Sequence, residues 1–317
     1  MQLKSYILIV FSLLMLNINL AVNAASKEIT WAGCGISKKG FMSDMAKAYE
    51  KKTGIKINLS GGGATKGLRK VASGKINLGG SCRLPLIFRD KDGTSKVIGI
   101  ENNLHVIPVG WDALVAIVHK QNNLIDNITT DQLQKILTGK ITNWNQLGAK
   151  INKPINVYVR KGKISGVGLT LRQQLFNNVD QKFASTAIVL KSSGKIEKAL
   201  EKDKFGIAVS GISSSRHRKL KMLKLDAIEP TMENLKKSKY SLYRILFLVA
   251  PKDYKKDPDL KAFVDFALSI QGQKVIKKAG TLPYRLGLGL LRTATSFSYL
   301  QSMDVVDREG IYSLGGH

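Results

Sequence analysis

The stretch Ile55-Lys-Ile-Asn-Leu-Ser-Gly-Gly-Gly-Ala-Thr65 decides the fold, because an apolar extended run passes there into a glycine-rich turn. The turn opens a helical pattern that continues to Val71. The strand-like runs on either side, Glu28 to Cys34 and Ile76-Asn-Leu78, border turns of the same kind. Strands that alternate with helices in this way indicate an α/β fold with parallel strands and crossover helices.

Four glycine- and hydroxyl-rich turns occupy such positions. They are Trp31-Ala-Gly-Cys-Gly-Ile-Ser37, Ser60-Gly-Gly-Gly-Ala-Thr65, Gly79-Gly-Ser-Cys-Arg83 and Arg160-Lys-Gly-Lys-Ile-Ser-Gly-Val-Gly168. The first N–H groups of a helix have no partner within it, and the helix dipole adds positive charge there. In open α/β sheets, ligands bind beyond the carboxyl ends of the strands, where these turns fall. Helix capping explains any single Ser or Thr, whereas the recurrence predicts an oxyanion site.

The rest of the chain continues the alternation. Two apolar extended segments, His105 to Val109 and Ala113 to His119, are interrupted by Gly110-Trp111-Asp112. We expect further strands over 155–159, 206–210 and 243–249, and helices over 40–52, 130–137, 169–176, 196–202, 257–272 and 272–279. Periodicity is lost after about Arg292, which leaves a C-terminal tail over 293–317 whose role the sequence does not define.

The N-terminus predicts export. Residues 1–24 combine Lys4, an apolar stretch from Tyr6 to Leu16, and small residues before Ala25, as in a cleaved secretory signal peptide. We therefore expect a periplasmic protein. An alternative interpretation takes Ala32-Gly33-Cys34 as a lipoprotein acylation site, although Ser26 to Thr30 separates it from the apolar stretch.

The chain is strongly basic throughout. Its 317 residues contain 50 Lys and Arg against 23 Asp and Glu, a formal net charge of +27. The basic residues are spread along the whole sequence, and no nucleic-acid-binding motif accompanies them. A solvated basic surface is the simpler interpretation, and we expect no specific nucleic-acid partner.

The sequence has two cysteines, Cys34 and Cys82, and both lie in the predicted anion turns. In an oxidising compartment they could form a disulfide that links two ligand loops. The alternative is a pair of buried free thiols.

Catalytic motifs are not visible. The four histidines show no zinc spacing, and Ser165 lies outside the nucleophile-elbow pattern. The run Gly61 to Gly67 lacks the Gly-Lys-Ser/Thr ending of a nucleotide-binding loop. We therefore expect a protein that is not an enzyme and that uses no metal or cofactor.

Three segments give the chain a family likeness between about Ile29 and Tyr284. They are Gly61-Gly-Gly-Ala-Thr-Lys-Gly67 with Ile76-Asn-Leu-Gly-Gly-Ser-Cys-Arg83, then Leu133-Gln-Lys-Ile-Leu-Thr-Gly-Lys-Ile-Thr-Asn-Trp144, and Arg160 with Ser165-Gly166. In these segments the chain resembles the periplasmic phosphate-binding proteins of ABC importers, in the type 2 periplasmic solute-binding protein superfamily.

The resemblance implies a two-lobed α/β fold, each lobe a mainly parallel sheet flanked by helices, with a two-segment hinge. Lobe 1 would comprise residues 25–111 and 250–292, and lobe 2 residues 112–249. The hinge segments would lie near Trp111 to Ala113 and near Leu246 to Ala250.

The resemblance also implies the ligand and its contacts. The expected ligand residues are Gly35, Ile36, Ser37, Gly63, Ala64, Thr65, Ser81, Arg83, Arg160, Ser165, Gly166 and Val167. Many family members have Thr at the position of Val167, so this chain has one hydroxyl donor fewer. Asp112 is a candidate acceptor for the proton of hydrogen phosphate, with a hinge or capping role as the alternative.

The implied function is capture of inorganic phosphate between two lobes by a monomer, for an ABC permease at the inner membrane. Binding of another oxyanion, sulfate or molybdate, is one alternative. A secreted basic module that adheres to anionic surfaces is the other, and it would need no hydroxyl-lined site.

Overall fold

The computed structural model describes residues 28–89, 95–97 and 99–293, so the predicted signal peptide and the tail beyond Thr293 lie outside the described residues. A sheet of ten strands runs through the described chain, with the main order β2-β1-β3-β13-β6-β10-β8-β9. Its strands are β1 (Glu28–Gly33), β2 (Lys56–Ser60), β3 (Leu78–Ser81), β6 (Leu104–His119), β8 (Asn156–Arg160), β9 (Ile188–Leu190), β10 (Gly206–Gly211), β11 (Leu220–Met222), β13 (Tyr243–Pro251) and β14 (Leu282–Pro283). Two further pairs join β4 (Ile87–Arg89) to β5 (Ser95–Val97) and β7 (Asn127–Ile128) to β12 (Lys224–Leu225).

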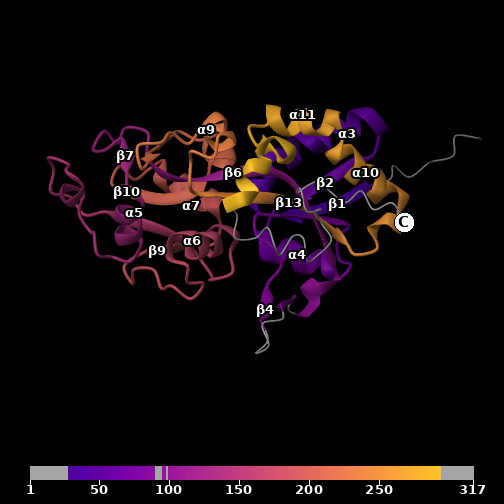
Figure 1. Ribbon diagram of the computed structural model, residues 1–317, viewed down its shortest axis with the longest axis horizontal. Coiled ribbons are helices and arrows are strands. Elements are labelled where there is room, and N and C mark those ends of the chain that lie inside the picture. Colours follow the sequence, from indigo (N-terminus) through magenta and orange to yellow (C-terminus); the bar gives the residue numbers. More distant parts are fainter. Residues whose placement is uncertain (1–27, 90–94, 98, 294–317) are drawn as a thin grey trace, which may run out of the picture.

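The sheet has two halves that are built alike. Strands β2, β1 and β3 are mutually parallel in one half, and β10, β8 and β9 are mutually parallel in the other. The long strands β6 and β13 run antiparallel to each other and join the halves, which lie on the right and left of Figure 1. The predicted α/β, two-lobed architecture is confirmed, with an antiparallel pair at its centre.

Helices cover both halves of the sheet. The first half carries α2 (Gly35–Ser37), a π-helix (Lys38–Met42), α3 (Ser43–Thr53), α4 (Ala64–Ala72), α10 (Pro258–Leu268) and α11 (Ile270–Lys278). The second half carries α5 (Thr130–Leu137), α6 (Gly166–Phe176), α7 (Ser193–Leu200), α8 (Ile212–Ser215) and α9 (Met232–Lys236). Short 3-10 helices span Gly99–Asn103, Trp144–Leu147, Tyr254–Lys256 and Tyr284–Thr293. Within the described residues, no helix has the length and apolar character needed to cross a membrane.

Local sequence sets where several helices begin. Thr129 and Gln132 form a reciprocal capping box at the start of α5, and Asp257 caps α10, whose first residue is Pro258. Ser165 caps α6, so this helix begins at Gly166 and not near Leu169 as predicted. The predicted helix over 40–52 likewise begins earlier, because α2 and the π-helix precede α3.

Strand β6 is continuous through Gly110-Trp111-Asp112, so the predicted interruption is wrong. Residues 110–112 pair with Leu246, Ile245 and Arg244 of β13, which keeps the backbone in the ladder. The Trp111 indole N–H donates to the carbonyl of Tyr284 at 2.9 Å, and the two rings stack. A buried tryptophan with a satisfied N–H can stay within a central strand.

Both predicted hinge segments lie on the two central strands. Trp111 to Ala113 of β6 pair with Ile245, Arg244 and Tyr243 of β13, and Leu246 to Ala250 continue β13 beyond that point. The 3-10 helix Tyr284–Thr293 contacts both β6 and α9, so the end of the described chain also reaches the second half.

Strand β1 bears on the lipoprotein alternative. It lies between β2 and β3 and pairs with both. Cleavage before Cys34 would remove this strand from the sheet, so the structure argues against acylation at that cysteine.

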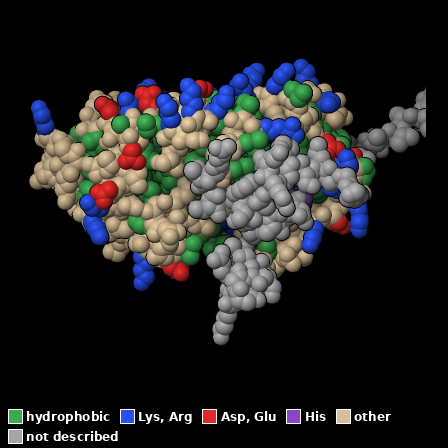
Figure 2. Space-filling view, viewed as in Figure 1, with side chains coloured by type: hydrophobic (Ala, Val, Ile, Leu, Met, Phe, Trp, Pro, Cys, Tyr) green, Lys and Arg blue, Asp and Glu red, His purple; other side chains and the backbone are tan. Residues whose placement is uncertain are grey.

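Charged side chains are distributed over the surface in view. Figure 2 shows Lys and Arg scattered around the molecule and interspersed with acidic groups. This agrees with the interpretation of the net charge as a solvated basic surface.

Candidate functional site

Turns from the two halves of the sheet meet at one place, which we call the interlobe site. The Thr65 hydroxyl, in the first half, donates to the carbonyl of Ile164 in the second half at 3.0 Å. Gly63 has a φ of +92°, and a Cβ there would lie 3.6 Å from Nη2 of Arg160. A Cβ at Gly166 would overlap Sγ of Cys82. Glycine at 166 therefore lets the start of α6 approach the Cys82 side chain of the first half, and glycine at 63 accommodates the positive φ.

The N-terminus of α6 points into this site. The Ser165 hydroxyl accepts from the N–H of Gly168 at 3.3 Å, so its own role is to cap the helix. Gly166 and Val167 supply the first two N–H groups, for which a helix contains no acceptor. An α-helix of eleven residues adds the positive end of its dipole at this point. The turn therefore offers the backbone N–H groups of Gly166 and Val167 as donors.

Cys34 and Cys82 lie side by side at the same place, after the adjacent strands β1 and β3. Both are buried free cysteines, so the predicted disulfide is absent from the structure. Their side chains are hydrogen-bonded, and Cys34 Sγ also accepts from the N–H of Ser37 at 3.2 Å. Burial opposes ionisation of Cys34, but the hydrogen bond from Cys82, the charge of Arg244 and the contacts of Ser37 together lower its pKa to about 6. The hydrogen bond to Cys34 and burial raise the pKa of Cys82.

Arg160 brings a positive charge to the interlobe site from the end of β8. Its Nη1 donates to the carbonyl of Leu190 at 3.3 Å, while Nη2 lies toward Gly63. Burial lowers its pKa, and the two thiols oppose that shift. No acidic side chain among the described residues forms an ion pair with Arg160, so its charge is available to an anion.

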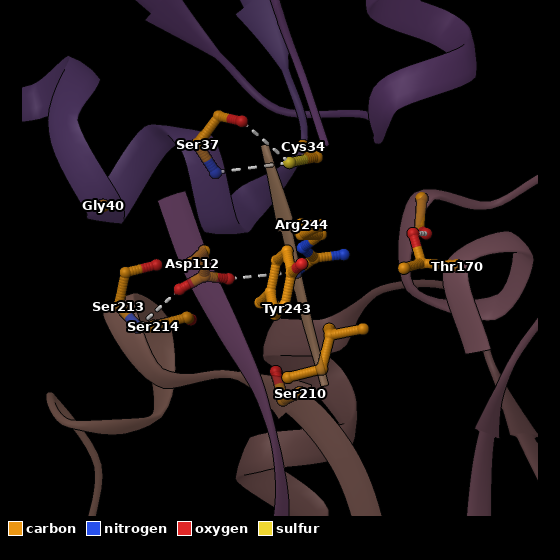
Figure 3. A network of polar contacts seen from close by, with 12 residues as sticks. Cys34, Ser37, Gly40, Asp112, Thr170, Ser210, Ser213, Ser214, Tyr243 and Arg244 are labelled. Carbon is orange, nitrogen blue, oxygen red and sulfur yellow. Dashed lines mark hydrogen bonds and ion pairs between the residues drawn. The ribbon is translucent and has the colours of Figure 1, made fainter. Parts of the chain in front are cut away.

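Arg244 of β13 is a candidate ligand that the sequence analysis missed. Its Nη2 donates to Asp112 at 3.2 Å, and Asp112 also accepts from the N–H of Ser213 at 3.0 Å. The Nε and Nη1 groups of Arg244 are buried and have no partner among the described residues. Figure 3 shows its guanidinium between Asp112 and Cys34. Two buried nitrogen donors without partners, beside a turn that offers backbone N–H groups, indicate a place for an acceptor.

The sequence of the strand Tyr243 to Val249 could have identified Arg244 as a candidate. An arginine within an otherwise apolar buried strand needs a partner, because burying an unpaired charge is costly. Asp112 occupies the facing position on β6. It is therefore an ion-pair partner at the crossing of the two strands, and both its oxygens are engaged.

A second network holds the segment that carries Ser213. Glu197 of α7 is fully buried and accepts from the hydroxyls of Ser210 and Ser214 at 2.7 and 3.0 Å, and from Arg218 at 3.3 Å. These bonds fix α8 against α7, so the N–H of Ser213 is presented to Asp112.

Arg83 is not placed as an anion ligand. Its Nη1 and Nη2 bind the two carboxylate oxygens of Glu101 at 3.0 and 2.8 Å, and further bonds run to Leu84 and Thr65. The Ser81 hydroxyl is likewise turned back onto the backbone of Arg83, at 2.6 Å from its carbonyl oxygen. Both residues therefore support the turn, and of their side-chain polar atoms only Nε of Arg83 is left without a partner among the described residues.

The remaining predicted residues differ in placement. Ser37 is fully buried and donates to the carbonyl of Ser81 at 3.1 Å. Ile36 packs against Gly211 of the second half, whereas Gly35 is exposed. Gly63 donates its N–H to the carbonyl of Gly33, and Ala64 is buried at the start of α4. Among the described residues, no cluster of His, Cys, Asp or Glu could hold a metal ion.

Comparison with known proteins shows which family and which structures the chain resembles. A family model described as the PBP superfamily domain matches residues 22–270. The phosphate-binding protein PstS of Borreliella burgdorferi is 25% identical over 291 residues, which cover 88% of this chain and 98% of that protein.

Two solved structures share the fold. A Clostridium perfringens protein crystallised with bound phosphate has a TM-score of 0.69 at 24% identity, over 81% of this chain and 99% of its own. An ABC-type phosphate transport receptor from Vibrio cholerae has a TM-score of 0.58 at 24% identity, over 81% of this chain and 100% of its own. The chain therefore belongs to the family described as the PBP superfamily domain.

Proposed function

We propose that this protein binds inorganic phosphate at the interlobe site and delivers it to the permease of an ABC importer. The observation that carries the proposal is the buried guanidinium of Arg244, whose Nε and Nη1 have no partner among the described residues. Arg160 and the N-terminus of α6 lie around the same thiols. A divalent anion at this point would receive donors from both halves of the sheet.

The donor set suits an anion that must leave water. Hydrogen phosphate has many acceptor positions, and a buried anion without hydrogen bonds is strongly unfavourable. Guanidinium groups bind such oxygens in a fixed planar geometry, and backbone N–H groups add donors without added charge. Arg160, Arg244, Gly166 and Val167 together provide both kinds of donor.

The relatives support phosphate over other ligands. The Borreliella burgdorferi relative, which the chain matches almost end to end, is named a phosphate-binding protein, and the Clostridium perfringens structure contains phosphate. We propose a binding role and no catalysis, in a monomer exported to the periplasm. We also propose that residues 25–111 and 250–292 move as one lobe and 112–249 as the other.

Titration calorimetry tests this function. Mature protein freed of phosphate by unfolding and refolding is titrated with phosphate, sulfate and molybdate at high salt. We expect one phosphate per chain and weaker heats with the other two. Arg160→Met should weaken phosphate binding about tenfold or more, because it removes an unpaired charge from the site. Lys161→Met, which removes the same charge from the exposed neighbouring residue, should change the affinity little.

Two outcomes would contradict the proposal. Absence of heat with all three anions would exclude an oxyanion site, and sulfate binding as tight as phosphate binding would exclude phosphate selectivity. Equal weakening by both variants, with a steep loss of binding as salt rises, would favour the basic adhesion module instead.

A further inference from the structure

Two reduced thiols lie inside the proposed anion site. Cys34 and Cys82 follow neighbouring parallel strands, are 6% and 2% exposed, and are hydrogen-bonded to each other. Neither is bonded covalently. The function proposed above uses neither sulfur atom, although both lie beside groups that are proposed to bind the anion.

The groups that would hold an anion also act on these thiols. Cys34 Sγ accepts the Ser37 N–H, and the charge of Arg244 favours its ionised form. Arg160 interacts with both sulfur atoms from the second half, and Gly166 at the start of α6 lies against Cys82. A thiolate at Cys34 would therefore take up the positive potential that phosphate needs.

We propose that Cys34 and Cys82 are a redox-modified pair that sets the affinity of this site: the dithiol opposes anion binding, and the disulfide permits it. The inference rests on the proposed function, because it assumes that the anion binds beside the two sulfur atoms. Disulfide formation removes the negative charge and leaves the cationic groups and N–H donors to the ligand.

The oxidation balances with a small disulfide such as oxidised glutathione as the oxidant. The Cys34 thiolate attacks one sulfur of that disulfide, and the first glutathione leaves as a thiolate. Cys82 then loses its proton to solvent and attacks the mixed disulfide at Cys34, which releases the second glutathione. Two electrons pass to the oxidant. Since Gly166 covers Cys82, the reagent reaches the pair when the two halves separate.

The size of the effect follows from ionisation of Cys34. A divalent anion next to a thiolate requires that the sulfur first take up a proton, and the pKa of Cys34 is about 6. At a pH about two units higher, that protonation costs about a hundredfold in affinity. The charged groups that face the pair are Arg244, Arg160 and Asp112, and they are the same in both redox states.

The experiment compares redox states of the full mature chain. Protein is equilibrated with reduced or with oxidised glutathione, the reagent is removed, and free thiols are counted by alkylation and mass spectrometry. Phosphate is then titrated into each form at pH 8 and at pH 6. We expect two free thiols in the reduced form and none in the oxidised form. Phosphate should bind about a hundredfold more tightly to the oxidised form at pH 8, with a much smaller difference at pH 6.

Two single variants that cannot form the disulfide sharpen the test. Cys34→Ser keeps a capping oxygen for the Ser37 N–H and removes the ionising sulfur, whereas Cys82→Ser keeps Cys34. Under reducing conditions at pH 8, Cys34→Ser should bind phosphate as tightly as the oxidised wild type. Cys82→Ser should bind as weakly as the reduced wild type.

Equal affinity of the two wild-type forms at pH 8, or two free thiols after oxidation, would overturn the inference and leave the proposed function standing. Absence of phosphate binding in both wild-type forms and in Cys34→Ser would overturn the proposed function itself. The thiol count would still report whether the pair closes.

Discussion

Two buried arginine–carboxylate pairs, Arg83 with Glu101 and Arg244 with Asp112, differ in how many arginine nitrogens have a partner. Glu101 binds both terminal nitrogens of Arg83, at 3.0 and 2.8 Å. Asp112 receives one contact from Arg244 at 3.2 Å, so among the described residues Nε and Nη1 of Arg244 are buried without a partner, whereas Arg83 has only Nε in that state. The first pair completes a turn within one half, and the second leaves donors at the junction of the halves. The number of unmatched donors therefore separates a supporting arginine from a binding one.

The resemblance implied Arg83 as an anion ligand and did not include Arg244. The ion pair between Arg83 and Glu101 is the reason that we propose Arg244 for this role instead. The carboxylate partners explain the different roles of the two arginines. Glu101 binds both terminal nitrogens of Arg83, and an oxyanion would need the same edge of that guanidinium.

The largest expected effect is on folding, from Arg83→Met. Removing Arg83 leaves the buried Glu101 with the longer contact from Arg69, at 3.7 Å, and the Leu86 N–H, so the loss should approach the cost of a broken buried ion pair, about 3–5 kcal/mol. Thermal and denaturant unfolding should show this loss, while phosphate affinity of the folded fraction should change less than about threefold, within the range of a remote substitution.

The double variant Arg83→Met with Glu101→Gln is the control, and it should recover much of the lost stability because no buried charge remains. A single variant that unfolds like the wild type but no longer binds phosphate would place Arg83 in the site and contradict the comparison.

The next largest effect is on binding, from Arg244→Met combined with Asp112→Asn. The double change keeps the net charge and removes the unmatched donors, so phosphate affinity should fall about a hundredfold. Calorimetry on the folded variant measures it. The single change Arg244→Met should be less stable than the double variant, because Asp112 would then be buried without its cation.

The matched control is again the Arg83 and Glu101 double variant. If both double variants bind phosphate equally well, the unmatched donors of Arg244 have no role in binding. If both lose binding, the two arginines are equivalent and the distinction fails.

Local patterns predicted more of the fold than of the site. The strand, turn and helix alternation around Ser60 to Thr65 depends on neighbouring residues, and the structure contains it. The continuity of β6 through Trp111 depends on Tyr284, which is far away in the sequence. The ion pairs of Arg83 and Arg244 depend on Glu101 and Asp112 in the same way. Local sequence shows which groups a turn offers, whereas tertiary contacts decide which of them are already taken.

A smaller effect concerns acid stability. Burial raises the pKa of Glu101, but Arg83, the Leu86 N–H and Arg69 together lower it below the usual value of 4.5. A carboxyl group with a depressed pKa in the folded state stabilises the protein above its unfolded pKa. That stabilisation is lost as pH falls through the lower, folded pKa.

Unfolding free energies measured between neutral and acidic pH should therefore decline more steeply below about pH 4.5 for the wild type than for the Arg83 and Glu101 double variant. Parallel curves would mean that Glu101 does not depend on its arginine.

The smallest expected effect comes from Val167→Thr. This substitution adds a hydroxyl donor at the start of α6, where the chain has an apolar side chain. Val167 is the second residue of α6, directly after Gly166, and is 3% exposed. In the ligand-free protein, we expect the threonine hydroxyl to be buried without a hydrogen-bond acceptor. The free energy of unfolding should therefore fall by about 1 kcal/mol. With phosphate bound, the hydroxyl gains a hydrogen bond worth about 1 kcal/mol, or roughly fivefold in affinity. Val167→Ala shortens the side chain without adding a donor, and it should show no gain. If calorimetry gives both variants the same affinity, the anion does not reach the second residue of α6. Arg244 and Arg160 must then bind it farther from the start of that helix.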